Sequence, residues 1–368
     1  MYLALLLLLP LILCFLAKYV FWKDSFGWAP FLIAIGACAL TVLGGLAIEF
    51  YGVTSDTEVW SGTVTGRQRN EVSCSHSYPC NCHEVCTEDS NGHESCTEHC
   101  DTCYEHPFDV DWDVYFSTGK VISIAREDRQ GLIEPKRWDA VYTGEPTAET
   151  HSFTNYLLAA PGNVMLRHDA PKGFEALIPA YPDNIYDYYR VNRFLVMGGV
   201  PVTGRYDWEW ILNRLNAELG TVKQVNVIIV IVPTADPRYE YAIQKAWVGG
   251  KKNDLVVCIG VTGYPKIDWC RIVSWTTDES IKVLLRDDIQ GIGNLDHRDD
   301  IMGAVRREAI AHFHRRHMKD LKYLAAAHQP SGTVLLVILM LEVANVAASV
   351  YVSYRMQGGG YHRYGGYY

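Results

Sequence analysis

Three long apolar runs constrain this chain more than any other feature of its 368 residues. Residues 2–17 and 25–48 carry no charge, and residues 331–354 carry one, at Glu342. A stretch of about 20 apolar residues crosses a bilayer as a helix, and the second and third runs have that length. We therefore expect transmembrane helices at 25–51 and at 331–354.

The first run is shorter, and two interpretations of it are open. It resembles the apolar core of a signal peptide, but it has no basic start and no small-residue cleavage site follows it. Extension to Trp22 provides enough length for a span, with Lys18 snorkelling toward the head groups. We favour the second interpretation, in which residues 1–24 comprise a third transmembrane helix and a short loop.

The charges beside these runs predict an orientation. With three spans, the loop that holds Lys18 and Lys23 shares a side with the Gly- and Tyr-rich tail 355–368, which carries arginines and no acid. Lys and Arg in short flanking segments stay cytoplasmic, whereas long domains translocate largely regardless of charge. We expect a multi-pass protein of the cell (inner) membrane, with its soluble bulk outside the cytoplasm.

Residues 74–103 hold seven cysteines and four histidines. In an oxidising compartment such density predicts disulfides, with one cysteine of the odd count left free or paired between chains. Two Cys-x3-Cys pairs also flank a turn at Asn91-Gly92, and thiolates at the base of a hairpin can hold zinc. We favour disulfides over zinc or free thiols. The residues concerned are Cys74, Cys80, Cys82, Cys86, Cys96, Cys100 and Cys103.

Alternating apolar and polar residues predict a small antiparallel β module over 52–146, into which the Cys-rich hairpin 74–103 is inserted. Residues 109–115 alternate strictly, with three aspartates on the face opposite Val110, Trp112 and Val114. That aspartate face is compatible with calcium binding, but a solvated face is the favoured interpretation. Residues 147–205, rich in Tyr, Pro and Asn, are expected to form a connector.

From residue 206 to 328, helical patterns alternate with strands too apolar to be solvated on either face. The strands are expected at 222–232, 254–261 and 269–275, and a long last helix at 297–324. Such alternation predicts a sheet covered by helices on both faces. The fold class is therefore a membrane-anchored α+β protein with three transmembrane helices, a small Cys-rich antiparallel β module and an α/β domain.

The order of elements from 206 to 322, with the signatures "LNAELG", "AWVGGKK" and "NDLVVCIGV", resembles the TPM-domain family of membrane-anchored proteins. Members of that family often carry the domain outside the membrane, followed by one span and a glycine-rich tail. The resemblance implies either weak metal-dependent phosphatase activity or an accessory role in assembling or repairing membrane complexes. It does not extend to the Cys-rich hairpin or to the first two spans.

Carried onto this chain, the resemblance implies acidic candidates for a metal site in the α/β domain. Carboxylates gathered at the edge of the sheet could hold Mg²⁺ or Ca²⁺, and the metal could activate water against a phosphoester. Ordinary structural roles are the alternative, since acids suit the first turn of a helix. The candidates are Asp254, Asp287, Asp288, Asp296, Asp299 and Asp300.

Glu342 lies near the middle of the last apolar run, and Asn345 is one turn later. An ionisable group at that depth is costly and usually faces protein rather than lipid. We therefore predict an intramembrane contact of both residues with the N-terminal helices or with a second copy. The expected partners are membrane lipids and membrane proteins. The net charge of -9 argues against nucleic acid.

These observations favour an extracytoplasmic scaffold or accessory factor for the assembly or maintenance of an envelope or membrane complex. A metal-dependent membrane-bound phosphatase and a phage- or virus-encoded membrane or structural protein are the alternatives. The sequence contains no P-loop, nucleophile elbow or zinc-protease motif. We therefore leave open whether the protein is an enzyme, and assign no catalytic residue.

Overall fold

The computed structural model describes residues 2–21, 29–88, 94–163, 165–166, 169–187 and 189–358. The predicted loop at Lys23, the hairpin tip at Asn91-Gly92 and most of the C-terminal tail lie outside these residues. The chain divides into two compact units. One, the helical unit, comprises Met1–Asp56, Ser152–Leu166 and His317–Tyr368, and the other, the main unit, comprises Thr57–His151 and Arg167–Arg316.

The helical unit is built from long apolar helices. These are α1 (Tyr2–Phe21), α2 (Ala29–Thr54) and α9 (Gly332–Gly358), with the short α4 (Tyr156–Ala159) and the 3-10 helix η2 (Met318–Ala327). Within the described residues, two segments are long and apolar enough to cross a membrane, Leu32–Thr54 of α2 and Gly332–Val352 of α9. The predicted first span does form a helix, α1, but its membrane crossing stays a prediction.

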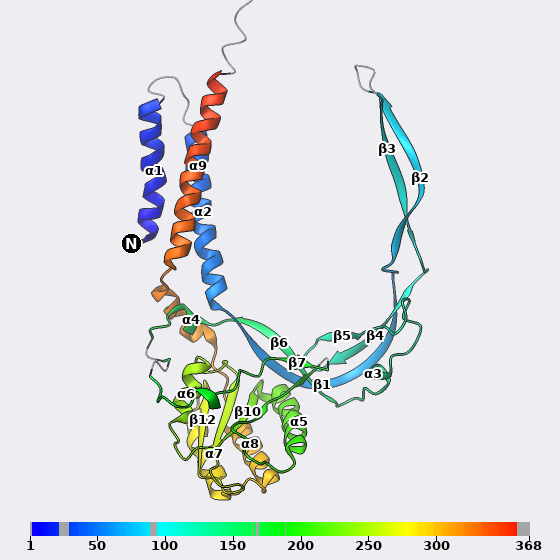
Figure 1. Ribbon diagram of the computed structural model, residues 1–368, viewed down its shortest axis with the longest axis vertical. Coiled ribbons are helices and arrows are strands. Elements are labelled where there is room, and N and C mark those ends of the chain that lie inside the picture. Colours follow the sequence, from blue (N-terminus) through cyan, green and yellow to red (C-terminus); the bar gives the residue numbers. More distant parts are fainter. Residues whose placement is uncertain are drawn as a thin grey trace, which may run out of the picture. The chain divides into compact units, whose positions relative to one another are not determined.

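Small residues bring α2 and α9 together (Figure 1). A Cβ added at Gly45 would lie 3.0 Å from the side chain of Ile338. Cys14 of α1, Cys38 of α2 and Val346 of α9 belong to one buried cluster. Many of the other apolar side chains on α2 and α9 are exposed, as suits helices whose outer faces meet lipid tails.

The main unit contains a four-stranded sheet in the order β5-β4-β1-β6. Its strands are β1 (Ser55–Val72), β4 (Asp109–Phe116), β5 (Val121–Ile124) and β6 (Pro146–Thr154). Val110, Trp112 and Val114 are buried on one face, as their alternation predicts. The opposite face is not fully solvated, however, because Asp109 is completely buried. The short helix α3 (Lys136–Asp139) and strands β7 (Ile185–Tyr186) and β8 (Arg190–Val191) belong to the same unit.

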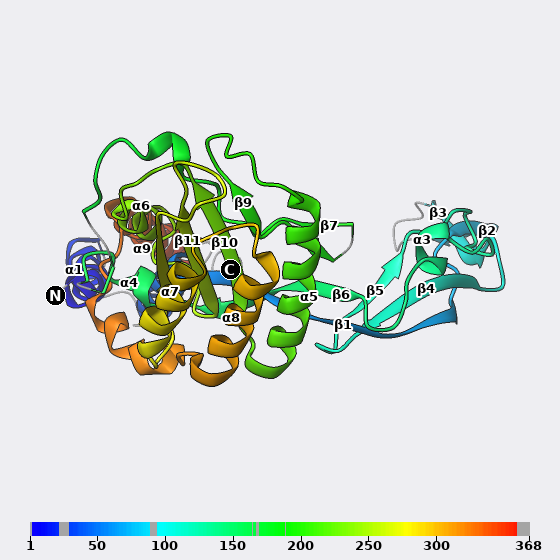
Figure 2. The ribbon, with the colours of Figure 1, turned by 90° about the horizontal axis from the view of Figure 1, so that it is seen from below.

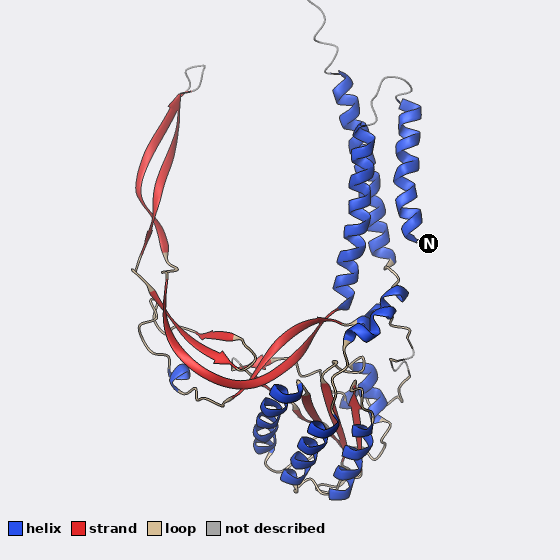
Figure 3. Ribbon diagram, turned by 180° about the vertical axis from the view of Figure 1, so that it is seen from behind, coloured by secondary structure: helices blue, strands red, loops and turns tan. Residues whose placement is uncertain are grey.

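Strands β2 (Ser77–Glu88) and β3 (Glu94–Tyr104) pair antiparallel as a separate two-stranded sheet, here called the disulfide ribbon. β1 leads into the ribbon and β4 follows it, so the ribbon is an insertion between two neighbouring strands of the larger sheet (Figure 3). The predicted hairpin inserted in a β module is therefore the arrangement that the structure shows.

A second sheet of the main unit has the order β12-β11-β10-β9. Its strands are β9 (Phe194–Val196), β10 (Asn226–Val232), β11 (Asp254–Gly260) and β12 (Trp269–Ser274). β9, β10 and β11 run parallel, and β12 is antiparallel. Every residue of β10 and β11 is buried, as continuous apolar strands require. β9 lies in the range that was expected to be a connector. The sequence did not indicate this strand, because three residues are too few to show the period of a strand.

Helices cover both faces of this sheet (Figure 2). α5 (Arg205–Lys223), α7 (Ser280–Ile292) and α8 (Arg298–His312) bury their apolar residues with Ile229 and Val257. On the other face, α6 (Tyr239–Ala246) packs with Ile228 and Val256, near the 3-10 turn η1 (Glu175–Leu177). Alternate residues of each central strand thus serve opposite cores, as the sequence pattern predicts.

The prediction of one helix over 297–324 is wrong. α8 ends at His312, and η2 begins at Met318. The backbone of His314 bonds instead to the segment after β12, accepting from Thr277 N at 2.9 Å and donating to Thr276 Oγ1 at 3.0 Å. Because these bonds replace helical ones, the helix does not continue through His314.

Candidate functional site

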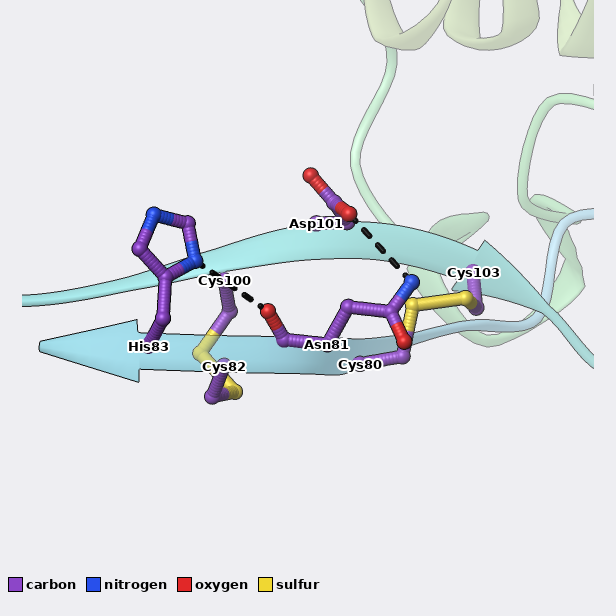
Figure 4. Close-up of a disulfide and its surroundings, with 7 residues drawn as sticks. All are labelled: Cys80, Asn81, Cys82, His83, Cys100, Asp101 and Cys103. Atoms are coloured by element: carbon purple, nitrogen blue, oxygen red, sulfur yellow. Dashed lines mark hydrogen bonds between the residues drawn. A yellow bond between two sulfur atoms is a disulfide. The ribbon is translucent and has the colours of Figure 1, made fainter.

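Three disulfides cross the ribbon. They join Cys80 to Cys103, Cys82 to Cys100 and Cys86 to Cys96. Figure 4 shows the first two, with the side chain of Asn81 between them donating to Asp101 Oδ2 at 3.3 Å. Since these six sulfurs are bonded in three pairs, none of them is present as a thiolate that could bind zinc. Cys74, the seventh, is a buried free thiol.

The ribbon has no hydrophobic core of its own. The described side chains of β2 and β3 are exposed on both faces except for a few that are half-buried, and Tyr78, Val85 and Tyr104 are open to solvent. A lone two-stranded hairpin is marginally stable in water, and each native disulfide of a small element contributes about 2–4 kcal/mol. The ribbon is therefore stabilised by its disulfides rather than by the packing of side chains in a core.

The structure does not bring the predicted metal-binding aspartates together. Four of them are exposed and Asp288 is half-buried, and each of these five has its own partner. The pairs are Asp287 with Arg286, Asp288 with Arg307, Asp296 with Tyr264, Asp299 with Arg298 and Asp300 with His297. Among the described residues, the clusters with metal-ligand geometry include none of these aspartates.

Asp254, the sixth candidate, is a buried carboxylate with three donors. It accepts from Tyr181 Oη at 3.0 Å, Asn226 Nδ2 at 2.9 Å and Lys251 N at 2.6 Å. Burial raises the pKa of Asp254 to about 6, against the effect of these bonds. Asp254 opens β11, so it lies at the amino ends of the parallel strands. Ligand crevices of parallel sheets usually lie at the carboxyl ends, the opposite end from Asp254.

Glu342 and Asn345 both face α2. Glu342 is fully buried, and its backbone oxygen lies 3.8 Å from Cys38 Sγ. Asn345 Nδ2 donates to Thr41 Oγ1 at 3.2 Å. The backbone of Glu342 and the side chain of Asn345 thus contact α2, while neither carboxylate oxygen of Glu342 has a hydrogen-bond partner among the described residues.

Sequence reasoning did not find a cavity of about 390 Å³ between β6, the β7–β8 turn and α5. Here it is called the tyrosine cavity, and aromatic side chains form much of its wall. Those residues are Tyr142, Tyr186, Tyr189, Tyr206 and Trp210, and the polar ones are Glu145, Thr147, Arg190, Arg193, Glu209 and Asn213. The high Tyr content of the expected connector was the one sequence feature that could have indicated this cavity. It did not show where the connector contacts α5.

Four buried polar atoms of this cavity have no hydrogen-bond partner within the described part of the chain. They are Glu145 Oε2, Thr147 Oγ1, Tyr189 Oη and Arg193 Nε. Leaving such a group unsatisfied costs about 1–3 kcal/mol. A ligand that pairs with them would recover this energy.

Both signs of charge border the tyrosine cavity. Burial raises the pKa of Glu145, while the nearby Arg137 and Arg190 oppose this rise. Burial lowers the pKa of Arg193 to about 10, so this guanidinium remains charged at neutral pH. Its Nη1 donates to Ser61 Oγ at 2.7 Å and to Asn226 Oδ1 at 2.9 Å, and its Nη2 donates to Asn213 Oδ1 at 3.3 Å. The cavity therefore suits a ligand with both donors and acceptors.

Fold and disulfides together define a mixed α/β protein with two candidate membrane helices and a disulfide-bonded β ribbon. In comparisons with known proteins, no family model, curated protein or solved structure matches the chain. The resemblance to the TPM-domain family stays a prediction.

Proposed function

We propose that this protein is a membrane-anchored, extracytoplasmic accessory factor that holds a partner of an envelope or membrane complex through its disulfide ribbon. Two apolar helices support an anchor in the cell (inner) membrane. Disulfides form and persist in oxidising compartments, which supports a position of the ribbon outside the cytoplasm.

The observation that carries this proposal is the ribbon itself, cross-linked by three disulfides while its side chains remain open to solvent. Proteins normally bury one face of a sheet against a core. A strand pair stabilised covalently and exposed on both faces provides a stiff surface for contact with another molecule.

The charge of the ribbon indicates the kind of partner. Residues 77–104 contain no Lys or Arg, and Glu84 and Glu98 lie directly opposite each other on the two strands. Exposed Tyr78, Val85 and Tyr104 lie among the acids. Complementary charge steers and orients association, so the partner is expected to be a protein with a basic surface that includes an apolar patch.

The test uses the full chain in its native membrane, with a photo-cross-linker in place of Val85. We expect discrete cross-linked adducts that disappear in Glu84→Lys/Glu98→Lys. Asp287→Lys, a reversal of an exposed acid on α7, is the matched control and should retain them. Adducts that persist unchanged in the ribbon variant would refute the proposal.

A second candidate function, binding of a small sugar, is favoured by the four unpartnered polar atoms of the tyrosine cavity. Aromatic faces can pack on the apolar face of a pyranose ring, while a few placed polar groups fix orientation. N-acetylglucosamine is the probe, and the expected result is a rise in Tm of the full protein that Tyr189→Phe reduces. Equal melting with and without the sugar would eliminate this candidate.

Metal-dependent phosphatase activity stays a prediction, since the described clusters with metal-ligand geometry contain none of its six candidate aspartates.

A further inference from the structure

The seventh cysteine lies at the base of the ribbon, where β1 passes into β2 and β3 into β4 (Figure 1). Cys74 is only 6% exposed. Beside it are His106 and Asp109, which come from the segment between β3 and β4 and from the first residue of β4. A thiol, an imidazole and a carboxylate therefore meet where the β1–β2 link approaches the β3–β4 link.

Their reactive atoms converge. Cys74 Sγ is 3.7 Å from His106 Nδ1, and that nitrogen is 3.4 Å from Asp109 Oδ1. Zinc binds Cys, His and Asp at about 2.3, 2.0 and 2.0 Å in a tetrahedron, which implies edges of about 3.5 Å between sulfur and nitrogen and about 3.3 Å between nitrogen and oxygen. The two observed separations are close to those edges. We propose that Cys74, His106 and Asp109 bind a zinc ion.

A catalytic relay is the other chemistry that these side chains could perform, and the geometry disfavours it. In a nucleophile–histidine–acid triad, the nucleophile and the acid contact different ring nitrogens of the histidine. Here both short separations involve Nδ1 of His106. Three donors that point at one place, rather than in a chain, are the arrangement that a metal ion requires.

Asp109 contributes a buried carboxylate whose two oxygens have different surroundings. Its side chain is fully buried, and Oδ1 has no hydrogen bond within the described residues. Oδ2, in contrast, accepts from Ser75 N at 2.9 Å, Ser75 Oγ at 3.0 Å and Arg126 Nη1 at 2.8 Å. These bonds orient the carboxylate so that Oδ1 faces His106. Such outer partners commonly fix the ligands of a metal.

The backbone of His76 positions the sulfur of Cys74. Its N donates to Cys74 Sγ at 3.4 Å, and its O accepts from that sulfur at 3.6 Å. Arg126, which bonds both Asp109 and Asp111, supplies positive charge close to the two anionic ligands.

A cavity of about 550 Å³ adjoins the cluster and is lined by Cys74, His106, Tyr104 and Glu105 among others. Zinc with three protein ligands keeps a fourth position for water or an outside ligand, unlike a closed structural site. The proposed ion therefore has access to solvent. This inference goes beyond the accessory role, because zinc at the base of the ribbon does not depend on what the ribbon contacts.

The experiment measures metal in the purified full chain. The protein in detergent is stripped with EDTA, dialysed, and titrated with Zn²⁺ and separately with Co²⁺. We expect about one zinc per chain by mass spectrometry, and with cobalt the visible bands of a tetrahedral site together with a thiolate charge-transfer band. Cys74→Ser and His106→Ala should each weaken zinc binding at least 10-fold.

Two controls separate loss of the site from loss of the fold. Cys258→Ala removes another buried thiol, and His99→Ala another ribbon histidine, and both should bind like the wild type. A mass-spectrometric count of the three disulfides identifies variants that remain folded. Asp109→Asn keeps the size of the side chain and should also weaken zinc binding. Failure of the wild-type chain to take up zinc, or uptake that survives in Cys74→Ser/His106→Ala, would overturn the proposal.

Discussion

Buried charges in the main unit each have several partners. Glu58 is fully buried, and it lies 3.3 Å from both Lys252 Nζ and His151 Nδ1, with Arg315 and Trp60 also bonded to it. Desolvation lowers the pKa of Lys252, and the charge of Glu58 opposes this effect. Buried ion pairs are weak evidence for added stability, but breaking one is costly. The partners of Glu58 all come from the main unit itself.

Asp254 leads to a prediction about pH. Its pKa is about 6 in the folded chain against 3.8 unfolded, so the folded state binds more protons between these values. Stability should therefore fall as pH rises from about 4 to about 6, by at most about 3 kcal/mol. Asp254→Asn should flatten this part of the profile. Thermal melts of the full chain from pH 4 to pH 7 measure it, and a variant profile parallel to that of the wild type would contradict the assignment.

At the scale of elements, the disulfides and the hydrophobic cores lie in different parts of the main unit. All three disulfides lie within the ribbon, while the two four-stranded sheets are held by their own apolar clusters. The helices α2 and α9 depend on neither, because they pack through small residues and a few polar contacts. Each element type can therefore be perturbed without the others.

Loss of a ribbon disulfide should be local. Cys86→Ser/Cys96→Ser opens a bridge between residues separated by 10 positions, removing about 2–4 kcal/mol from the ribbon. We expect faster proteolysis within residues 77–104, with a melting temperature for the main unit within about 2 °C of the wild type. Protease mapping and calorimetry distinguish this from cooperative unfolding of the whole unit, which would show that the ribbon is part of a larger core.

The contact between α2 and α9 can be tested by cross-linking. In a Cys14→Ala background, Glu342→Cys should form a disulfide with Cys38 on oxidation, because the two residues are in contact. Leu341→Cys, one position away on an exposed face, should not. Protease cleavage between the helices followed by a gel shift measures the yield. Equal yields at both positions would exclude the packing shown in the structure.

At the scale of the whole molecule, the proposal depends on the side of the membrane on which the ribbon lies. We expect that, in intact cells, a membrane-impermeant maleimide labels ribbon cysteines only after reduction. A tag fused to the C-terminal tail should become accessible only after permeabilisation, because basic flanks stay cytoplasmic. Ribbon cysteines labelled without reductant, or an exposed tag in intact cells, would reverse the orientation.

Several features could be predicted because their causes are local. Apolar length identified α2 and α9, alternation placed Val110 and Trp112 in a core, and uninterrupted apolar runs indicated β10 and β11. Cysteine density indicated disulfides. These patterns depend on neighbouring residues and on the periods of helix and strand, so no knowledge of distant contacts was needed.

By itself, then, the sequence determined the two long apolar helices, the buried strands and the disulfide chemistry of the hairpin. Only the tertiary structure decided which cysteine remains unpaired, that the predicted aspartates lie apart, and that Cys74 meets His106 and Asp109. It also assembled the tyrosine cavity from residues up to 71 positions apart, Tyr142 to Asn213. The physical reason is that strand register and helix docking set such distances, and both are fixed by packing between segments remote in the chain.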